Sequence, residues 1–153
     1  MNHSESITKI SSALSIAWEN IGSAKKDGTN PHYRSSYSTL SEVIEVVKKP
    51  LLDQGIAVLQ PTVSEGDKEY VETILLHVSG EWISGRTLIV CAKPHDPQAQ
   101  GSAITYAKRY GLQAMCCVPS EDDDGEGAMD RQKKVKDPNA ELQALGSKKQ
   151  SDW

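Results

Sequence analysis

Two segments near the start of the chain carry apolar residues at helical spacing. The first contains Ile7, Ile10, Leu14, Ala17, Trp18 and Ile21. The second contains Leu40, Val43, Ile44, Val47 and Leu51. Residues three or four positions apart share one face of a helix, so we predict amphipathic helices over residues 4–21 and from Thr39 to about Gly55. Thr39 and Glu42 have the spacing of a capping box, and we expect Trp18 in the core.

Residues 56–63, 70–78 and 81–91 follow a different pattern. They are rich in β-branched and aromatic residues with partial alternation, and turn residues separate them. This pattern is typical of a three-stranded antiparallel meander. Asp96 and Pro97 then supply an N-cap and a first residue for a last helix. The order of elements predicts an α+β domain, a small three-stranded antiparallel sheet with helices packed on one face. The polar stretch 23–36 is expected to be a loop.

The last helix has two different faces when its residues are placed at about 100° per residue. Mostly small and apolar residues share one side: Ala103, Ile104, Ala107, Tyr110, Gly111, Ala114 and Met115. Polar residues share the other: Ser102, Thr105, Tyr106, Arg109 and Gln113, with Lys108 at the border. We therefore expect Tyr110 in the core and Arg109 in the middle of an exposed polar face. The small residues let the helix backbone lie close to the surface that it covers.

Charge is distributed unevenly along the chain. The 153 residues suffice for one domain with a real core, and the formal net charge is −4. From Ser120 onward nine acidic residues stand against six basic ones, and the hydrophobic periodicity is lost after Gly125. We predict a folded domain over residues 1–127 and a mostly disordered polar tail over residues 128–153. Because the net charge is negative, local clusters of cations would have to hold any nucleic acid.

The cysteines and the termini indicate a reducing, cytoplasmic setting. Cys91, Cys116 and Cys117 form neither a metal-binding spacing nor a disulfide framework. The first residues lack the features of a signal peptide, and the apolar runs are too short to cross a bilayer. We expect buried thiols, no membrane association and no metal or other cofactor.

Two motifs carry the candidate chemistry. The first, residues 30–40, reads Asn-Pro-His-Tyr-Arg-Ser-Ser-Tyr-Ser-Thr-Leu; the second runs over residues 100–125 and ends in the acidic block Glu121–Asp124. Both resemble motifs of the essential recombination function family, the phage-type single-strand DNA annealing proteins, in the same order and over roughly residues 4–127. The resemblance implies a β-β-β-α core, a homo-oligomeric ring or filament, and single-stranded DNA as partner. It implies ATP-independent annealing in homologous recombination rather than an enzyme, with an exonuclease or a host single-strand binding protein as further partners to consider.

Binding of a single strand requires cations along the phosphates and aromatic faces near the bases. The two motifs interleave both kinds of residue, and the candidate DNA-binding set is Lys25, Lys26, Tyr33, Arg34, Tyr37, Tyr106, Lys108 and Arg109. We expect Lys108 and Arg109 to bind phosphates, and Tyr106 to stack on a base or bond to the backbone. Arg34 and Tyr33 would complete the groove. A solvated helix and an ordinary capping loop remain the alternative interpretation of these two segments.

Two other functions stay open alongside annealing. A Walker A phosphate-binding loop ends in Gly-Lys followed by Ser or Thr. The chain contains no Gly-Lys dipeptide, so the sequence does not support an ATPase recombinase. The acidic block could serve a metal-dependent nuclease, although two-metal sites gather carboxylates from separate elements. A protein-interaction module of the replication machinery is the third function, and it would have no affinity for oligonucleotides.

Overall fold

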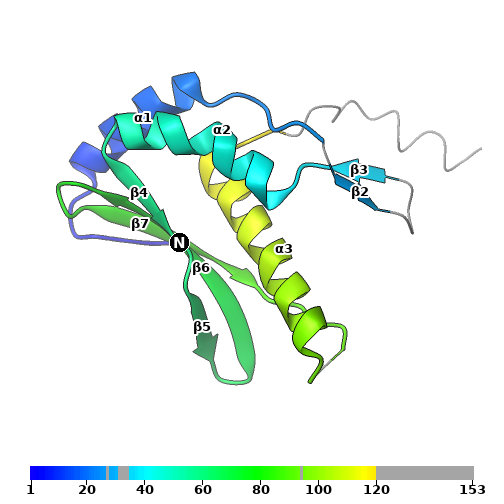
Figure 1. Ribbon diagram of the computed structural model, residues 1–153. Coiled ribbons are helices and arrows are strands. Elements are labelled where there is room, and N and C mark those ends of the chain that lie inside the picture. The colour runs from blue at the N-terminus through cyan, green and yellow to red at the C-terminus, as the bar shows by residue number, and fades with distance from the viewer. Residues whose placement is uncertain (27, 31–34, 94, 120–153) are drawn as a thin grey trace, which may run out of the picture. The chain divides into compact units, whose positions relative to one another are not determined.

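The chain folds into three helices and a five-stranded antiparallel sheet in a computed structural model that describes residues 1–26, 28–30, 35–93 and 95–119 (Figure 1). The sheet consists of β1 (Asn2–His3), β4 (Ile56–Leu59), β5 (Thr62–Glu65), β6 (Lys68–His77) and β7 (Trp82–Leu88). The helices are α1 (Thr8–Asn20), α2 (Leu40–Asp53) and α3 (Pro97–Cys116). A separate hairpin consists of β2 (Gly28–Asn30) and β3 (Ser35–Tyr37). The predicted α+β class is confirmed.

The long strand β6 organises the sheet. It pairs with β7 along one side, from Tyr70 opposite Leu88 to Leu76 opposite Trp82. Along its other side it pairs first with β5 and then with β4, so these two short strands share one partner. The strand β1 extends the sheet beyond β7. The hairpin of β5 and β6 points away from α1 and α2 (Figure 1).

The prediction of three strands is wrong in number, because the expected strand 56–63 is broken. Pro61 has no N–H to donate to a ladder, and its carbonyl instead accepts a hydrogen bond from the Glu72 N–H at 3.0 Å. Gln60 directs its side chain inward, where Nε2 donates to Thr73 Oγ1 at 2.9 Å and to the Lys108 carbonyl at 2.8 Å. The break therefore fastens the edge of the sheet to α3.

The other additions are strands too short for a periodic pattern. β1 has two residues, and Ser4 continues its pairing because the Ser4 N–H donates to the Trp82 carbonyl at 2.9 Å. Because Ser4 pairs with β7, α1 begins at Thr8, whereas the prediction was a start at Ser4. The hairpin of β2 and β3 occupies much of the stretch 23–36 that is expected to be a loop, and β3 extends one residue beyond it. Strands of two or three polar residues show too little alternation to be recognised from sequence.

The predicted caps of α2 and α3 are present. The Thr39 side chain accepts a hydrogen bond from the Glu42 N–H at 3.4 Å, and Gly55 follows α2 with a φ of 70°. This φ lies in the left-handed region that glycine tolerates best. At the start of α3, the Asp96 carboxylate accepts from the N–H groups of Gln98 and Ala99, and Pro97 occupies the first turn.

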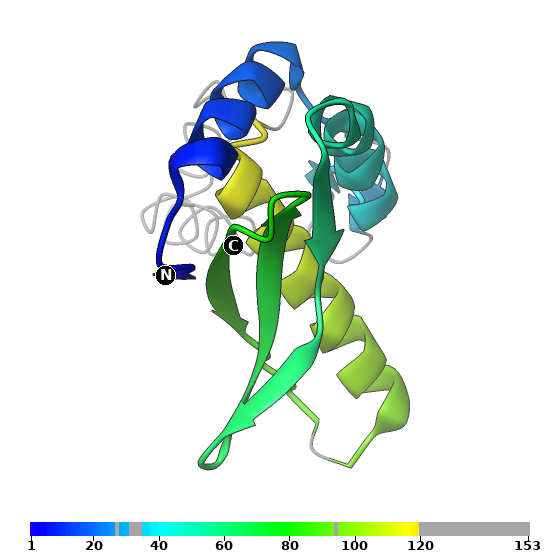
Figure 2. The same ribbon diagram turned by 90° about the vertical axis from the view of Figure 1, so that its left-hand side faces the viewer.

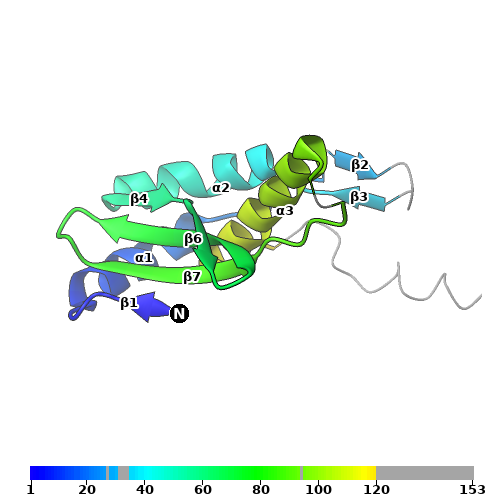
Figure 3. The same cartoon turned by 90° about the horizontal axis from the view of Figure 1, so that it is seen from below.

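All three helices cover the same face of the sheet, as the view from below shows (Figure 3). One buried cluster joins α1, α2 and the C-terminal half of α3 to Ile56 and Leu75 of the sheet. The second joins the N-terminal half of α3, through Ala103 and Ala107, to Val71. Figure 2 shows α1 and α2 next to each other at one end of the sheet. α3 therefore packs on β6 and β7 and contributes to both clusters.

Strand register places apolar residues on the opposite face of the sheet as well. Leu59 lies opposite Ile74, and Leu76 lies opposite Trp82, at positions that alternate with the buried residues of β6. Leu59 is 47% exposed, and no described helix covers this face. Farther along the face, Arg86 pairs with Glu65 at 2.9 Å and with Glu72 at 3.6 Å. The face is thus apolar near β4 and charged near the β5–β6 hairpin.

The prediction that Trp18 lies in the core is wrong. Its side chain is 62% exposed, whereas Ile10, Ala13 and Ala17 form the buried stripe of α1. The tryptophan lies at the border of that stripe, where helical spacing alone does not decide which side is covered. The predicted domain boundary at residue 127, the acidic block and the tail lie outside the described residues.

Glu81, in the turn before β7, caps α1 from a distance. Its Oε2 accepts from the Lys9 N–H at 2.7 Å and from the Ile10 N–H at 2.8 Å, and Ser6 Oγ donates to its other oxygen. The Ile10 hydrogen bond is the largest cause of a pKa below the ordinary 4.5, and the Ser6 and Lys9 bonds lower the pKa further. The contact joins the start of α1 to the sheet.

The Glu81→Gln variant should be less stable than the parent at neutral pH, because the negative charge is lost from a helix N-terminus. Since the pKa of Glu81 is lower in the folded state, its contribution is complete above about 4.5 and disappears as the pH falls through the folded pKa. Urea midpoints for parent and variant should therefore converge in acid. Glu5→Gln, at an exposed position in the segment before α1, is the control. A constant difference in midpoint down to the acid limit would contradict this account.

Candidate nucleic-acid interface

Helix α3 lies unusually close to the sheet at Gly111. A Cβ at this position would lie 2.6 Å from Thr73 Oγ1 and 2.9 Å from Thr87 Oγ1, which is closer than real Cβ atoms approach. Ala103 and Ala107 precede Gly111 along the helix and are buried. Small residues thus allow the close approach that the sequence predicted for this helix.

Arg109 connects the two sequence motifs. Its Nη1 donates a hydrogen bond to the Ser38 carbonyl at 2.9 Å, across 71 positions of the chain. The Ser38 hydroxyl in turn donates to the Ala24 carbonyl at 2.9 Å. Arg109 is only 6% exposed and Ser38 only 2%. The arginine therefore holds the end of β3 and the start of α2 against α3.

Three tyrosines surround the Arg109 guanidinium. Its Cζ lies 4.7 Å from the ring centroid of Tyr37, 4.9 Å from that of Tyr106 and 4.6 Å from that of Tyr110. The Tyr37 and Tyr106 centroids are 6.5 Å apart, and those of Tyr106 and Tyr110 are 6.2 Å apart. Contacts within about 6 Å of a ring face are favourable cation–π interactions. We call these four residues the tyrosine–arginine cluster.

The cluster corrects the predicted faces of α3. Arg109 was expected on an exposed polar face but is buried, and Tyr110 was expected in the core but is 55% exposed. The reason is that α3 has two buried sides. Arg109, Leu112 and Cys116 are all buried at a spacing that forms a second stripe, away from the side that contacts the sheet through Gly111. A helical wheel with one buried side assigns this second stripe to solvent.

Of the predicted DNA-binding residues, Tyr37, Tyr106 and Arg109 come together, and Tyr110 joins them. Lys108 does not, because a residue two positions from Tyr106 points to the opposite side of a helix. The carbonyl of Lys108 accepts the hydrogen bond from Gln60, beneath α3.

The other predicted cations are Lys25 and Lys26, which precede the first motif, and Arg34 within it. Lys25 is exposed and Lys26 is half-buried, and both lie between Ala24 and β2. Gly28 of β2 pairs with Tyr37, and a Cβ at Gly28 would lie 2.8 Å from the tyrosine ring. Tyr33 and Arg34 lie outside the described residues.

Tyr110 and the hairpin are the parts of this site that the sequence analysis missed. The pairing of Tyr106 with Tyr110, four positions apart, was a signal that both rings share a helix side. Gly28 facing Tyr37 is a contact that only the folded hairpin reveals.

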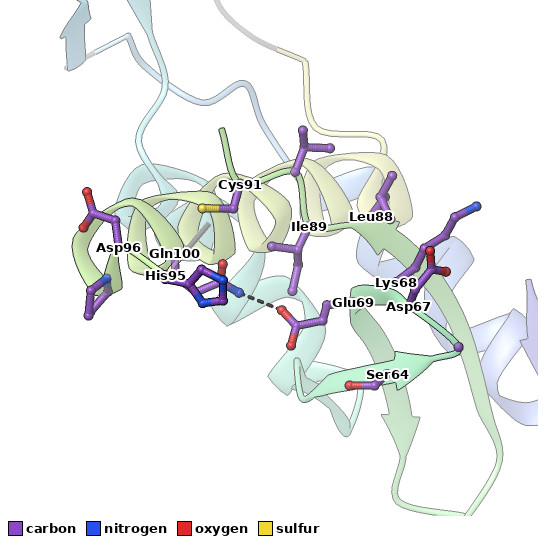
Figure 4. Close-up of a pocket in the computed structure, with 13 residues that line it drawn as sticks. Ser64, Asp67, Lys68, Glu69, Leu88, Ile89, Cys91, His95, Asp96 and Gln100 are labelled. Atoms are coloured by element: carbon purple, nitrogen blue, oxygen red, sulfur yellow. Dashed lines mark hydrogen bonds between the residues drawn. The ribbon is translucent and has the colours of Figure 1, made fainter. Parts of the chain in front are cut away.

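A groove lies near the start of α3, apart from the tyrosine–arginine cluster (Figure 4). It is an open groove of about 950 Å³ between the β5–β6 turn, the end of β7 and the first turn of α3. Across it, Gln100 Nε2 donates to Glu69 Oε2 at 2.7 Å. Its lining carries charges of both signs, the carboxylates of Asp67, Glu69 and Asp96 and the ammonium group of Lys68. None of the tyrosine–arginine cluster lines this groove, and its carboxylates disfavour a polyanion.

The cysteines differ in their surroundings. Burial, together with the neighbouring Cys117, raises the pKa of the Cys116 thiol to about 12, so this thiol stays protonated at neutral pH. Cys117 itself is exposed and follows α3 with a φ of 50°, and Cys91 is half-buried. The expectation of buried thiols therefore holds for Cys116 alone.

The described residues contain no group of three or more His, Cys, Asp and Glu side chains that could hold a metal ion. Within the same residues, no helix combines the length and the apolar character needed to cross a membrane.

Comparison with known proteins gives one result. The family model of the ERF superfamily matches residues 10–151, which is most of the chain and includes both motifs. Neither the comparison with curated proteins nor that with solved structures gave a significant match. Because the family match covers far more than half of the sequence, the chain belongs to the ERF superfamily.

Proposed function

We propose that this protein binds single-stranded DNA and anneals complementary strands without ATP, in homologous recombination of the phage or prophage type. Membership of the ERF superfamily supports a role in recombination. The observation that carries the proposal is the tyrosine–arginine cluster, which places the exposed rings of Tyr106 and Tyr110 side by side next to the β2–β3 hairpin.

The chemistry of this surface suits a single strand better than a duplex. Bases of a single strand are free to stack on aromatic side chains, and such stacking tolerates any sequence. The rings of the cluster would hold bases, while cations beside the hairpin, Lys25 and Lys26, would neutralise phosphates. Arg34, which lies outside the described residues, is a further cation for this role.

Annealing then requires no chemical step from the protein. Complementary pairing supplies the free energy, and the protein holds two strands extended and reduces their mutual repulsion. Because annealing needs no ATP hydrolysis, a chain without a Walker A loop could perform it.

The experiment that tests the proposal follows quenching between two complementary labelled oligonucleotides in the presence of the 153-residue chain. We expect pairing to be faster with protein than without, and the acceleration to be the same with and without ATP. The affinity of the protein for each oligonucleotide should fall as salt rises, because phosphate contacts are lost. Shortening of a labelled strand in Mg²⁺ would support the nuclease alternative. An absence of oligonucleotide binding at low salt would support the interaction module. A strict ATP requirement would also contradict the proposal.

Self-association is part of the proposal. The strand β4 contains only Ile, Ala, Val and Leu, and its outer edge pairs with none of the described strands. Edge strands that stay unpaired usually carry charges, prolines or bulges. Beside this edge lies a mostly apolar groove of about 380 Å³ between α2 and β4, with Leu52 58% exposed at its rim. These features favour a contact with a second copy, and sedimentation velocity of the purified chain measures it.

A further inference from the structure

Little of the Arg109 guanidinium is accessible to a phosphate. The side chain is 6% exposed, its Nη1 bonds to the Ser38 carbonyl, and Tyr37, Tyr106 and Tyr110 approach it within 5 Å. We infer that Arg109 is a positioning residue, which holds the tyrosines as a surface for stacking bases, and that other cations bind the phosphates. This inference deepens the proposed function and rests on it.

The shape of a guanidinium suits this task. It is planar, so an in-plane N–H can bond to a carbonyl while its faces contact aromatic rings. In the cluster the hydrogen bond to Ser38 fixes the plane, and the three rings pack around the cation. Lysine cannot reproduce this arrangement, because its ammonium group is a compact, strongly hydrated point charge. The contact therefore depends on the arginine and not only on its positive charge.

Holding the rings in place has a direct effect on binding. A free tyrosine loses rotational freedom when it stacks on a base, and this loss opposes binding. Tyr106 and Tyr110 are 42% and 55% exposed, yet both contact the buried Arg109, so part of that freedom is already lost before DNA arrives. Arg109 also fastens Tyr37, which comes from the other motif, to the same surface.

The test uses Arg109→Lys, which keeps the charge, and Arg109→Gln, which keeps a planar donor but removes the charge. For each variant, affinity for a labelled mixed-sequence oligonucleotide is measured at several salt concentrations. We expect both variants to bind about fivefold or more weakly, since stacking is impaired, while the dependence of log affinity on log salt stays that of the parent. A direct phosphate contact predicts the reverse: near-parental binding for Arg109→Lys, and a slope smaller by about 0.7 for Arg109→Gln. Lys25→Ala, which removes an exposed cation beside the hairpin, shows the size of slope change that the assay resolves.

A second readout does not depend on DNA. Near-ultraviolet circular dichroism reports the ordering of tyrosine rings, and we expect Arg109→Lys to reduce the tyrosine signal while the far-ultraviolet spectrum stays unchanged. Unaltered tyrosine signal and binding in both variants would overturn the inference, as would unfolding of both, which would assign Arg109 to the fold alone. If the parent itself fails to bind single strands while the tyrosine signal responds as expected, the proposed function fails and the positioning of the rings by Arg109 stands.

Discussion

Replacing both Tyr106 and Tyr110 with alanine is expected to weaken binding of single-stranded DNA by at least about thirtyfold, because each base stacked on an aromatic ring contributes about 1–3 kcal/mol. Both rings are exposed, so their removal costs the core little. Fluorescence anisotropy of a labelled oligonucleotide, titrated with parent and variant at one fixed salt concentration, measures the loss.

Two controls identify the cause of this loss. Tyr70→Ala on β6 removes a tyrosine that is outside the cluster and should leave the affinity near that of the parent. Phenylalanine at both Tyr106 and Tyr110 keeps the rings and should largely preserve binding. If the phenylalanine variant binds as weakly as the alanine variant, the hydroxyl groups bond to the strand and stacking is not the main contact. Parental affinity in the double alanine variant would remove this surface from the binding site.

Replacing Gly111 with alanine is expected to destabilise the fold by about 1–3 kcal/mol, the usual cost of overpacking a core. The added methyl group would meet Thr73 Oγ1 at 2.6 Å. Thr73 is fully buried, and its hydroxyl accepts the hydrogen bond from Gln60, so it cannot rotate away without losing that bond. Either α3 moves off the sheet or the contact with Gln60 is lost. Urea unfolding followed by far-ultraviolet circular dichroism measures the difference.

The same helix offers the matched control. Gly101 also lies in α3, but a Cβ there would meet nothing within 4 Å. Gly101→Ala should therefore stabilise the protein by about 0.5–1 kcal/mol, because alanine has the higher helix propensity. If the free energy of unfolding falls in Gly111→Ala and rises in Gly101→Ala, the loss arises from the contact of Gly111 with the sheet. A loss of stability in both variants, or in neither, would contradict the close approach at Gly111.

Local chemistry made much of the fold predictable. The buried residues Val43, Val47 and Leu51 follow the spacing read from the sequence of α2, and Asp96 caps α3 as expected. In each case the signal lies within a few neighbouring residues. The strands β1, β2 and β3 were missed because two or three residues carry no period, and their pairing depends on partners elsewhere in the chain.

The candidate site was predictable in composition but not in geometry. The sequence indicated that Tyr37, Tyr106 and Arg109 belong to one surface, and the structure places them in contact. The sequence could not indicate which of Arg109 and Tyr110 faces solvent, because that depends on where Ser38 docks against α3. A wheel assigns faces by polarity, whereas a buried arginine with a carbonyl partner and aromatic neighbours is polar and internal at once.

The contact between Arg109 and Ser38 has a consequence for the order of folding. It closes a loop of 71 residues that contains α2 and every strand from β4 to β7, and its second member lies on α3, the last of the described helices. Contacts across long loops form late, because the entropy of loop closure opposes them until other packing is in place. A chain on the ribosome that has emerged only as far as β7 has Tyr37 but neither Tyr106 nor Tyr110. The surface for bases is therefore completed only when α3 docks, so a nascent chain that lacks α3 cannot present it.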